Sequence, residues 1–180
     1  MLTREQILDA AEDVLRRYGP AKANVVDVAR ALNVSHGSVY RHFPSKAALR
    51  EAVAERFLDG MSAPLADVDD PKAWFDTLLV TKRAKAAEDP ELFATYVALA
   101  HESGDVVKRH VAHLVGQLTD LVGDERTARA LFLATARFHD PRHAASWGEP
   151  GIDDDFEAVW ELLAQAIARP ASSAHSSAAR

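Results

Sequence analysis

The feature that most constrains the fold is a pair of helix-end signals separated by a single residue. A predicted helix begins at Asn24, a suitable N-cap, and ends at Asn33, a residue that tolerates the left-handed conformation common after a helix. Only Val34 separates this stop from Ser35, the next N-cap signal. Two short helices joined so tightly form a helix-turn-helix, whose second helix is able to enter the major groove of DNA. The same motif also occurs as a plain packing unit, so spacing alone leaves both interpretations open.

The rest of the chain also has a helical pattern. Its 180 residues include 34 alanines and eight glycines, and no run of β-branched residues alternates with polar ones. Thr3 and Gln6 form a capping-box pair before the first apolar helix, which Gly19 and Pro20 stop. We therefore predict an all-α fold. Further helices are expected at about 36–42, from Ser45 onward, and at about 71–88, 90–101, 104–122, 125–138 and 154–168.

A break in the helical pattern divides the chain. The stretch 61–70 contains Pro64 and three aspartates and has the composition of a linker. We expect a three-helix, helix-turn-helix DNA-binding domain over 1–58 and a helical ligand-binding and dimerisation domain over 59–169. Residues 170–180, mostly alanine and serine, are expected to form a flexible tail.

Charge is divided in the same way. The chain has a net charge of −6, but residues 1–58 carry nine basic and seven acidic side chains, whereas residues 59–180 carry twelve and twenty. Residues 16–50 alone contain seven basic side chains and one acid, Asp27. A basic region in an acidic protein indicates a polyanionic partner for that region.

The second helix of the motif carries side chains suited to DNA. Gly37 and Ser38 are small enough for close approach, and Ser38 also offers a hydroxyl group. Arg41 is suited to pair with guanine or with phosphate. The further candidates, placed at phosphate reach, are Tyr40, His42 and Lys46.

The stretch from Asn24 to Arg50, with VYRHFPSK at 39–46, resembles the DNA-binding domain of the TetR family of bacterial repressors. The resemblance covers about the first 58 residues; Asn33 replaces the family's usual glycine and Ala48 its usual acid. It implies phosphate contacts from Tyr40, His42 and Lys46, and contacts at or near bases from 35–38 and Arg41. The full candidate set is Arg4, Lys22, Asn24, Ser35, His36, Gly37, Ser38, Tyr40, Arg41, His42 and Lys46.

Some of these side chains have alternative interpretations. Tyr40 and His42 could belong to the core, and Arg17 and Arg30 fit solvated helix faces better than DNA contacts. Phe43 is expected to be a core residue.

The resemblance also implies a homodimer, in which the last two long helices of each subunit form a four-helix interface. Two-fold pairing would place two recognition helices about 34–36 Å apart on one DNA face. The alternative is that the same residues form the core of one chain. The partner-facing candidates are Leu131, Phe132, Thr135, Val159, Trp160, Leu163 and Ile167.

The middle helices offer a ligand pocket, for which an apolar or aromatic inducer is expected. Plain core packing is the alternative for each of these positions. The candidates are Trp74, Phe75, Leu78, Phe93, Tyr96, Val97, His101, His110, His113 and Phe138, with Arg137 and His139 as further polar groups.

The histidines raise a second possibility, a metal-responsive regulator. His110 and His113 are spaced i, i+3, and His139 and His143 are spaced i, i+4, but Pro141 interrupts the second pair. We expect no metal site and no cofactor.

The remaining exclusions concern enzymes and membranes. There is no cysteine, no G-x-S-x-G and no phosphate-binding glycine loop, so an enzyme is not expected. A charged N-terminus without a signal peptide, and no long apolar segment, predict a cytoplasmic protein with no membrane partner. The overall prediction is a dimeric repressor that binds a palindromic DNA operator and is released by a small-molecule inducer. A helical adaptor that does not bind DNA would leave the basic region unexplained.

Overall fold

The computed structural model describes residues 2–22, 24–101 and 104–167. These residues form helices and no strand, which confirms the all-α prediction. The predicted tail over 170–180 lies outside the described residues. In chain order the elements are α1 (Arg4–Lys22), α2 (Val25–Ala31), α3 (His36–Tyr40), α4 (Lys46–Ser62), the 3-10 helix η1 (Ala63–Leu65), α5 (Pro71–Glu88), α6 (Pro90–His101), α7 (Asp105–Val122), α8 (Glu125–Ala134), α9 (Ala136–His139), the 3-10 helix η2 (Pro141–Ser146) and α10 (Ile152–Ile167).

The start of α1 has the predicted capping box. The Thr3 amide donates to Gln6 Oε1 at 3.0 Å, and the Gln6 amide donates to Thr3 Oγ1 at 3.2 Å. Near its end, Gly19 leaves the helical region with a φ of 71°, which favours glycine. The predicted stop at Gly19 is thus a kink, after which the helix continues to Lys22.

The helix-turn-helix forms as predicted. Asn24 caps α2 by accepting from the amides of Val26 and Asp27, and Ser35 caps α3 by accepting from the amide of Ser38. Asn33 has a φ of 53°, so its left-handed conformation turns the chain between the two helices. The helix α3 ends at Tyr40, two residues before the predicted end.

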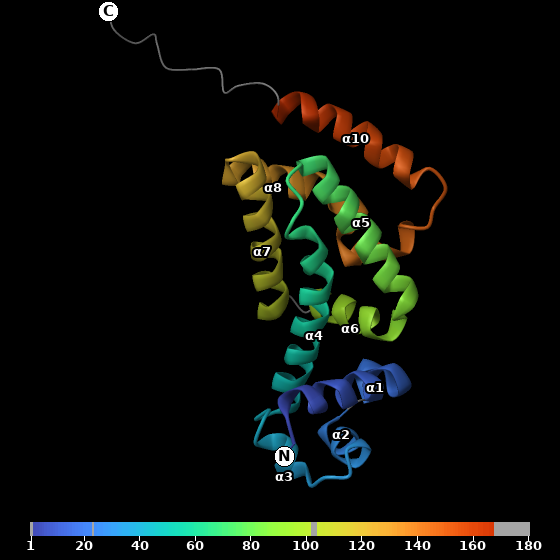
Figure 1. Ribbon diagram of the computed structural model, residues 1–180. Helices are drawn as coiled ribbons and strands as arrows, with labels where there is room; N and C mark the ends of the chain where they lie inside the picture. Colours follow the sequence, from blue (N-terminus) through green and yellow to red (C-terminus); the bar gives the residue numbers. More distant parts are fainter. Residues whose placement is uncertain (1, 23, 102–103, 168–180) are drawn as a thin grey trace, which may run out of the picture.

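The helix α4 connects the two ends of the molecule (Figure 1). Ser45 caps it as predicted, with its Oγ accepting from the amide of Ala48 at 3.0 Å. Leu49 and Val53 are buried in the core cluster of the helix-turn-helix, whereas Leu58 belongs to a second cluster with side chains of α6 and α7. The predicted boundary at 58/59 therefore falls inside one continuous helix, and η1 begins where the linker was expected.

The N-terminal unit also packs against α6. Leu92 of α6 is buried in the same cluster as the side chains of α1, α2 and α3. Arg16 of α1 forms an ion pair with Asp89, just before α6, at 2.8 Å. These contacts fix the helix-turn-helix against the C-terminal half on a side away from α3.

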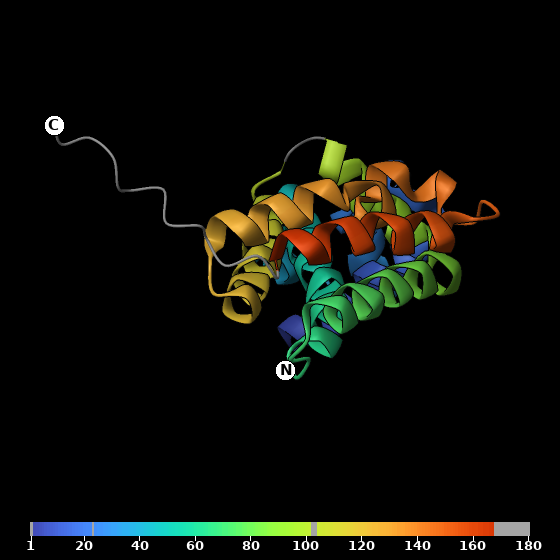
Figure 2. The same cartoon turned by 90° about the horizontal axis from the view of Figure 1, so that it is seen from above.

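The helices α5, α7, α8 and α10 surround the main core cluster of the C-terminal half, which includes Trp74, Leu118 and Phe156. Both α8 and α10 lie at the end of the molecule opposite α3, and Figure 2 shows them from above. No helix in the described part of the chain is long and apolar enough to cross a membrane.

The C-terminal half contains a helix break that the sequence did not predict. The expected helix over 125–138 is divided at Thr135, whose φ and ψ of −96° and 6° lie outside the helical region. The buried Thr135 hydroxyl donates to the carbonyl of Leu131 at 2.8 Å, a bond that tends to bend helices. The bend places Phe138 and His139 in the interior. Apolar spacing continues across Thr135, so the sequence pattern gave no sign of it.

Candidate functional site

One face of α3 packs on the N-terminal core, and the opposite face is exposed to solvent. Val39 and Phe43 are 0% and 1% exposed in the N-terminal core, which confirms Phe43 as a core residue. Tyr40 is 48% exposed and therefore lies outside the core. Its neighbours His36, Gly37 and Arg41 are also exposed, while His42 is half-buried. One face of α3 thus remains available to a partner.

Three side chains on this face form a hydrogen-bonded row. The hydroxyl groups of Ser35 and Ser38 lie 2.9 Å apart, and Arg41 Nη2 donates to Ser38 Oγ at 3.3 Å. These residues are spaced i, i+3 and i+6, so they project from one side of the helix. The row places the Arg41 guanidinium next to the Ser38 hydroxyl group.

Two further cations flank α3. The guanidinium of Arg4 lies 4.3 Å from the centre of the Phe43 ring, a cation–π contact that keeps its charge near the end of α3. Lys46 is exposed at the first position of α4, beside the amides of that helix terminus. Both positions were predicted as DNA contacts. The side chain of Lys22, another candidate, lies outside the described residues.

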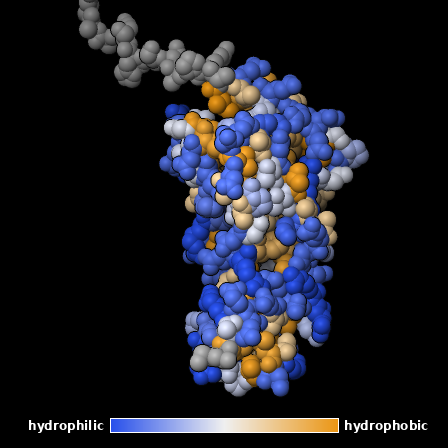
Figure 3. Space-filling model, viewed as in Figure 1, coloured by the Kyte–Doolittle hydropathy of each residue, from blue (hydrophilic) through white to orange (hydrophobic). Residues whose placement is uncertain are grey.

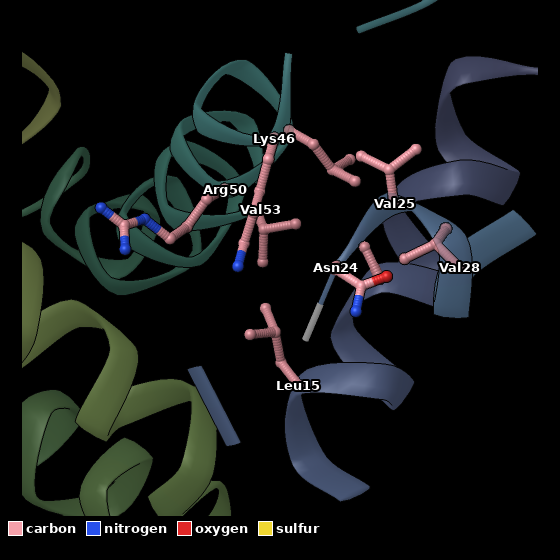
Figure 4. Close-up of a pocket in the computed structure, with 9 residues that line it drawn as sticks. Leu15, Asn24, Val25, Val28, Lys46, Arg50 and Val53 are labelled. Carbon is pink, nitrogen blue, oxygen red and sulfur yellow. The ribbon is translucent and has the colours of Figure 1, made fainter. Parts of the chain in front are cut away.

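Asn24 faces a small hollow between α1, α2 and α4 (Figure 4). Lys46 and Arg50 come from α4 on one side of it and Asn24 from α2 on the other. The volume of about 30 Å³ is the share of about one water molecule, so this hollow is too small for an organic ligand. The Oδ1 atom of Asn24 is already used for capping.

Part of the positive charge of residues 16–50 is neutralised by acidic side chains outside that range. Arg16 pairs with Glu12 and Asp13 of its own helix as well as with the distant Asp89. Arg30 is exposed and pairs with Asp27 at 3.0 Å, in accord with a solvated face. Within the described chain, Arg41 and Lys46 form no ion pair. Unpaired positive charge is therefore present beside α3.

In the C-terminal half, several predicted pocket residues form solid core. Trp74, Phe75 and Leu78 are each 0% exposed in the central cluster. Phe93 and Phe138 are also buried, and Val97 is half-buried. The side chain of His101 lies outside the described residues.

A cleft of about 360 Å³ lies beside this core, between α7 and the chain around α9 and η2. Of the predicted pocket set it includes Tyr96 and His110, and it also includes His139. His113 is exposed and lines a neighbouring hollow against α4. The residues lining the cleft are Lys82, Tyr96, Val107, Lys108, His110, Val111, Ala112, Leu114, Arg129, Phe132, His139, Asp140, Pro141 and Arg142.

Lys82 also lines the cleft, although the sequence had not led us to expect it there. Its side chain is 2% exposed, and its Nζ donates to the carbonyl of His139 at 2.8 Å. Burial lowers the pKa of Lys82 to about 8, against a smaller opposing effect of Asp140. The lysine follows Leu78 and Leu79 at the next position of the apolar stripe of α5, and a charged residue in such a stripe was the available signal.

The two buried histidines of the cleft are neutral. Burial, followed by the nearby charge of Lys82, lowers the pKa of His110 and of His139 to about 3. The Nε2 atom of His139 lies 3.0 Å from the carbonyl of Phe132, whereas the buried Nε2 of His110 has no hydrogen-bond partner. Unpartnered buried polar atoms are rare in folded proteins.

The acidic side chain that lines the cleft, Asp140, is hydrogen-bonded to Arg142. Burial favours the neutral form of Asp140, but hydrogen bonds from Arg142 lower its pKa. Arg142 Nε lies 2.9 Å from Asp140 Oδ1. No group of three or more potential metal ligands occurs among the described residues, so nothing here favours the metal-responsive alternative.

The predicted dimer residues occupy two environments. Leu131, Phe132 and Thr135 are buried inside the chain. The other four predicted residues are half-buried on α10, namely Val159, Trp160, Leu163 and Ile167.

Two family models match the chain. The model of bacterial regulatory proteins of the tetR family matches residues 7–53, and that of the tetracyclin repressor-like C-terminal domain matches residues 72–160. The uncharacterized HTH-type transcriptional regulator Rv1255c of Mycobacterium tuberculosis is 28% identical, in a match that covers 83% of this chain and 93% of that protein.

Solved structures share the fold. BioQ with its double-stranded DNA operator has a TM-score of 0.62 at 20% identity, covering 92% of this chain and 99% of that chain. FadR from Bacillus subtilis in complex with stearoyl-CoA has a TM-score of 0.57 at 19% identity, covering 89% of this chain and 97% of that chain. Together with the helix-turn-helix geometry, these matches identify the chain as a member of the TetR family of DNA-binding transcriptional regulators.

Proposed function

We propose that this regulator is a dimeric repressor that binds a palindromic operator through α3 and releases it when a small molecule occupies the cleft beside α7. The observation that carries the DNA-binding part is the Ser35–Ser38–Arg41 row on the open face of α3. Hydroxyl and guanidinium groups at such positions are able to read base edges or to bind phosphates. Arg4, Tyr40 and Lys46 are placed around them to position the helix on the DNA backbone.

The route from cleft to DNA runs through α7 and α4. His110 lines both the cleft and the neighbouring hollow that Leu58 of α4 also lines. Arg109 of α7 lies 3.4 Å from Glu55 of α4. Because α4 continues to the core around Leu49, a shift of α7 would move the helix-turn-helix as a unit. This coupling requires a ligand that binds the released state more tightly than the DNA-bound state.

The dimer surface is proposed at the end of the molecule opposite α3. Leu133 of α8 and Leu162 of α10 are 67% and 70% exposed on the two helices at this end, and apolar side chains that gather in one exposed patch mark interaction sites. The space-filling view in Figure 3 shows apolar patches near this end. The half-buried Trp160 and Leu163 would continue the surface, while Leu131 and Phe132 support it from inside.

Selection of binding sites from a random duplex library with the purified full chain tests this function. We expect an inverted repeat whose half-sites lie about 10–10.5 base pairs apart, centre to centre, or a multiple of that spacing. The variant Arg41→Ala should enrich different sequences, and Arg17→Ala, an exposed arginine outside α3, is the matched control. Enrichment of no sequence would refute DNA reading, and enrichment of single half-sites would refute the palindrome.

A further inference from the structure

The cleft beside α7 combines a largely apolar lining with a buried cation, Lys82. Lys82 of α5 reaches it from inside the core, and the one hydrogen bond to the His139 carbonyl occupies one of its three N–H donors. Its ammonium also lies 5.9 Å from the centre of the Tyr96 ring. Within the described residues, Lys82 forms no ion pair. A buried cation without a counter-charge is costly, and charges so placed are normally paired.

A second group points to the same missing partner. His110 is 7% exposed, and its Nε2 is buried without a hydrogen bond. A neutral imidazole carries its hydrogen on one of its two nitrogens, so the Nε2–H form offers a donor. An oxygen that accepted from His110 and lay beside the ammonium of Lys82 would satisfy both groups.

Most of the charged side chains that line the cleft are cations. Its lining carries four cations, Lys82, Lys108, Arg129 and Arg142, and one acid, Asp140. Arg142 binds that acid, so Asp140 offsets the charge of Lys82 only in part. Lys108 and Arg129 are exposed at the rim, where they pair with Asp105 and Glu125. Lys82 is therefore the cation of this lining that forms no ion pair among the described residues. A buried positive charge of this kind attracts a ligand of the opposite sign.

The remaining wall is apolar. Val107, Val111, Leu114 and Phe132 line it, and the volume of about 360 Å³ falls within the usual range of small-molecule sites. One buried cation with one neutral donor balances a single negative charge, whereas a doubly charged phosphate would leave a charge uncompensated. The chemistry therefore fits one carboxylate on an apolar body.

We propose that the effector is an organic acid, whose carboxylate pairs with Lys82 Nζ and accepts a hydrogen bond from His110, with its apolar part along α7. This inference rests on the proposed function, in which the cleft is the effector site. It adds a carboxylate to the apolar or aromatic inducer expected from sequence.

The test is calorimetric titration of the full chain with sodium salts of straight-chain acids of four to twelve carbons and of benzoate. Each acid is compared with its primary amide, which has nearly the same shape and no charge. We expect at least one acid to bind, with its amide binding at least tenfold more weakly. Lys82→Met should weaken acid binding at least tenfold, whereas Lys85→Met, on the same helix but outside the cleft, should not. Equal binding of acid and amide, equal binding by Lys82→Met, or no binding by any acid would overturn the proposal.

Operator binding, measured on the same samples, separates this inference from the proposed function. Unchanged operator affinity of the acid-free Lys82→Met variant shows that it is folded. An acid that binds through Lys82 without releasing the operator would sustain the acid site and refute ligand-induced release. Release by a neutral compound, with no binding of acids, would refute the acid site and sustain the proposed function.

Discussion

Replacing Lys82 by methionine should change how the stability of the protein depends on pH. Methionine has a similar length and no charge, so it removes the cost of burying an ammonium group. Lowering the pKa of Lys82 from 10.5 to about 8 corresponds to a cost of about 3 kcal/mol when the lysine is protonated in both states. This cost applies in full because the side chain is 2% exposed and little screened by solvent.

The sign follows from where the proton is bound. Below pH 8 both the folded and the unfolded chain carry the proton on Lys82, and the full cost is present. Between pH 8 and 10.5 the unfolded chain still binds the proton while the folded chain does not, so the cost disappears. The wild-type protein should therefore gain about 2.5 kcal/mol relative to Lys82→Met between pH 7 and 10.

The neighbours of Lys82 do not obscure this effect. The pKa values of His110 and His139 are lowered to about 3, so both remain neutral throughout this range. Asp140 has a lowered pKa and stays ionised, while burial raises the pKa of Tyr96 and keeps the phenol protonated. Lys82 is thus the group of this cluster that changes charge.

Thermal unfolding of both proteins, followed by circular dichroism at pH 7 to 10 without added ligand, provides the measurement. A chain of this size shifts by about 2–4 °C per kcal/mol, so the gap between the two melting temperatures should change by about 5–10 °C. Lys85→Met, which removes a lysine that pairs with Glu88 on the same helix, is the control. A gap that stays constant from pH 7 to 10 would show that Lys82 is not desolvated, and the reasoning would fail.

Three further predictions concern DNA and assembly. Lys46→Ala should weaken binding to every duplex and reduce the slope of log affinity against log salt by about one, as measured by fluorescence anisotropy at several salt concentrations; an unchanged slope would exclude a phosphate contact. Ser38→Ala breaks the row that holds Arg41 and should change the preferred bases, typically by about 1–3 kcal/mol at the affected position, in a competition assay against single-base operator variants; uniform weakening would contradict a reading role. Leu162→Glu should convert the dimer into monomers in sedimentation analysis, whereas Val80→Glu, at a site 67% exposed on α5, should not; an unchanged mass for Leu162→Glu would place the interface elsewhere.

Local chemistry made the N-terminal third of the fold predictable. Thr3, Asn24, Ser35 and Ser45 each cap the helix that the sequence assigned to them, because a cap depends on residues only two or three positions away. The left-handed Asn33 is local in the same sense. Apolar spacing likewise predicted α5 and α6 over the residues that form them.

What the sequence by itself determined is therefore the all-helical class, the helix-turn-helix and the outward residues of α3, since all of these follow from short-range capping and periodicity. Only the tertiary structure decided which charged side chains are paired and where a cleft remains between the helices. Arg16 is paired by Asp89, more than 70 residues away, and Trp74 and Phe75, assigned to a pocket, fill the core instead. The burial of Lys82 depends on packing between distant helices, and together with the bend at Thr135 it places a lysine, two neutral histidines and an apolar wall around one cleft.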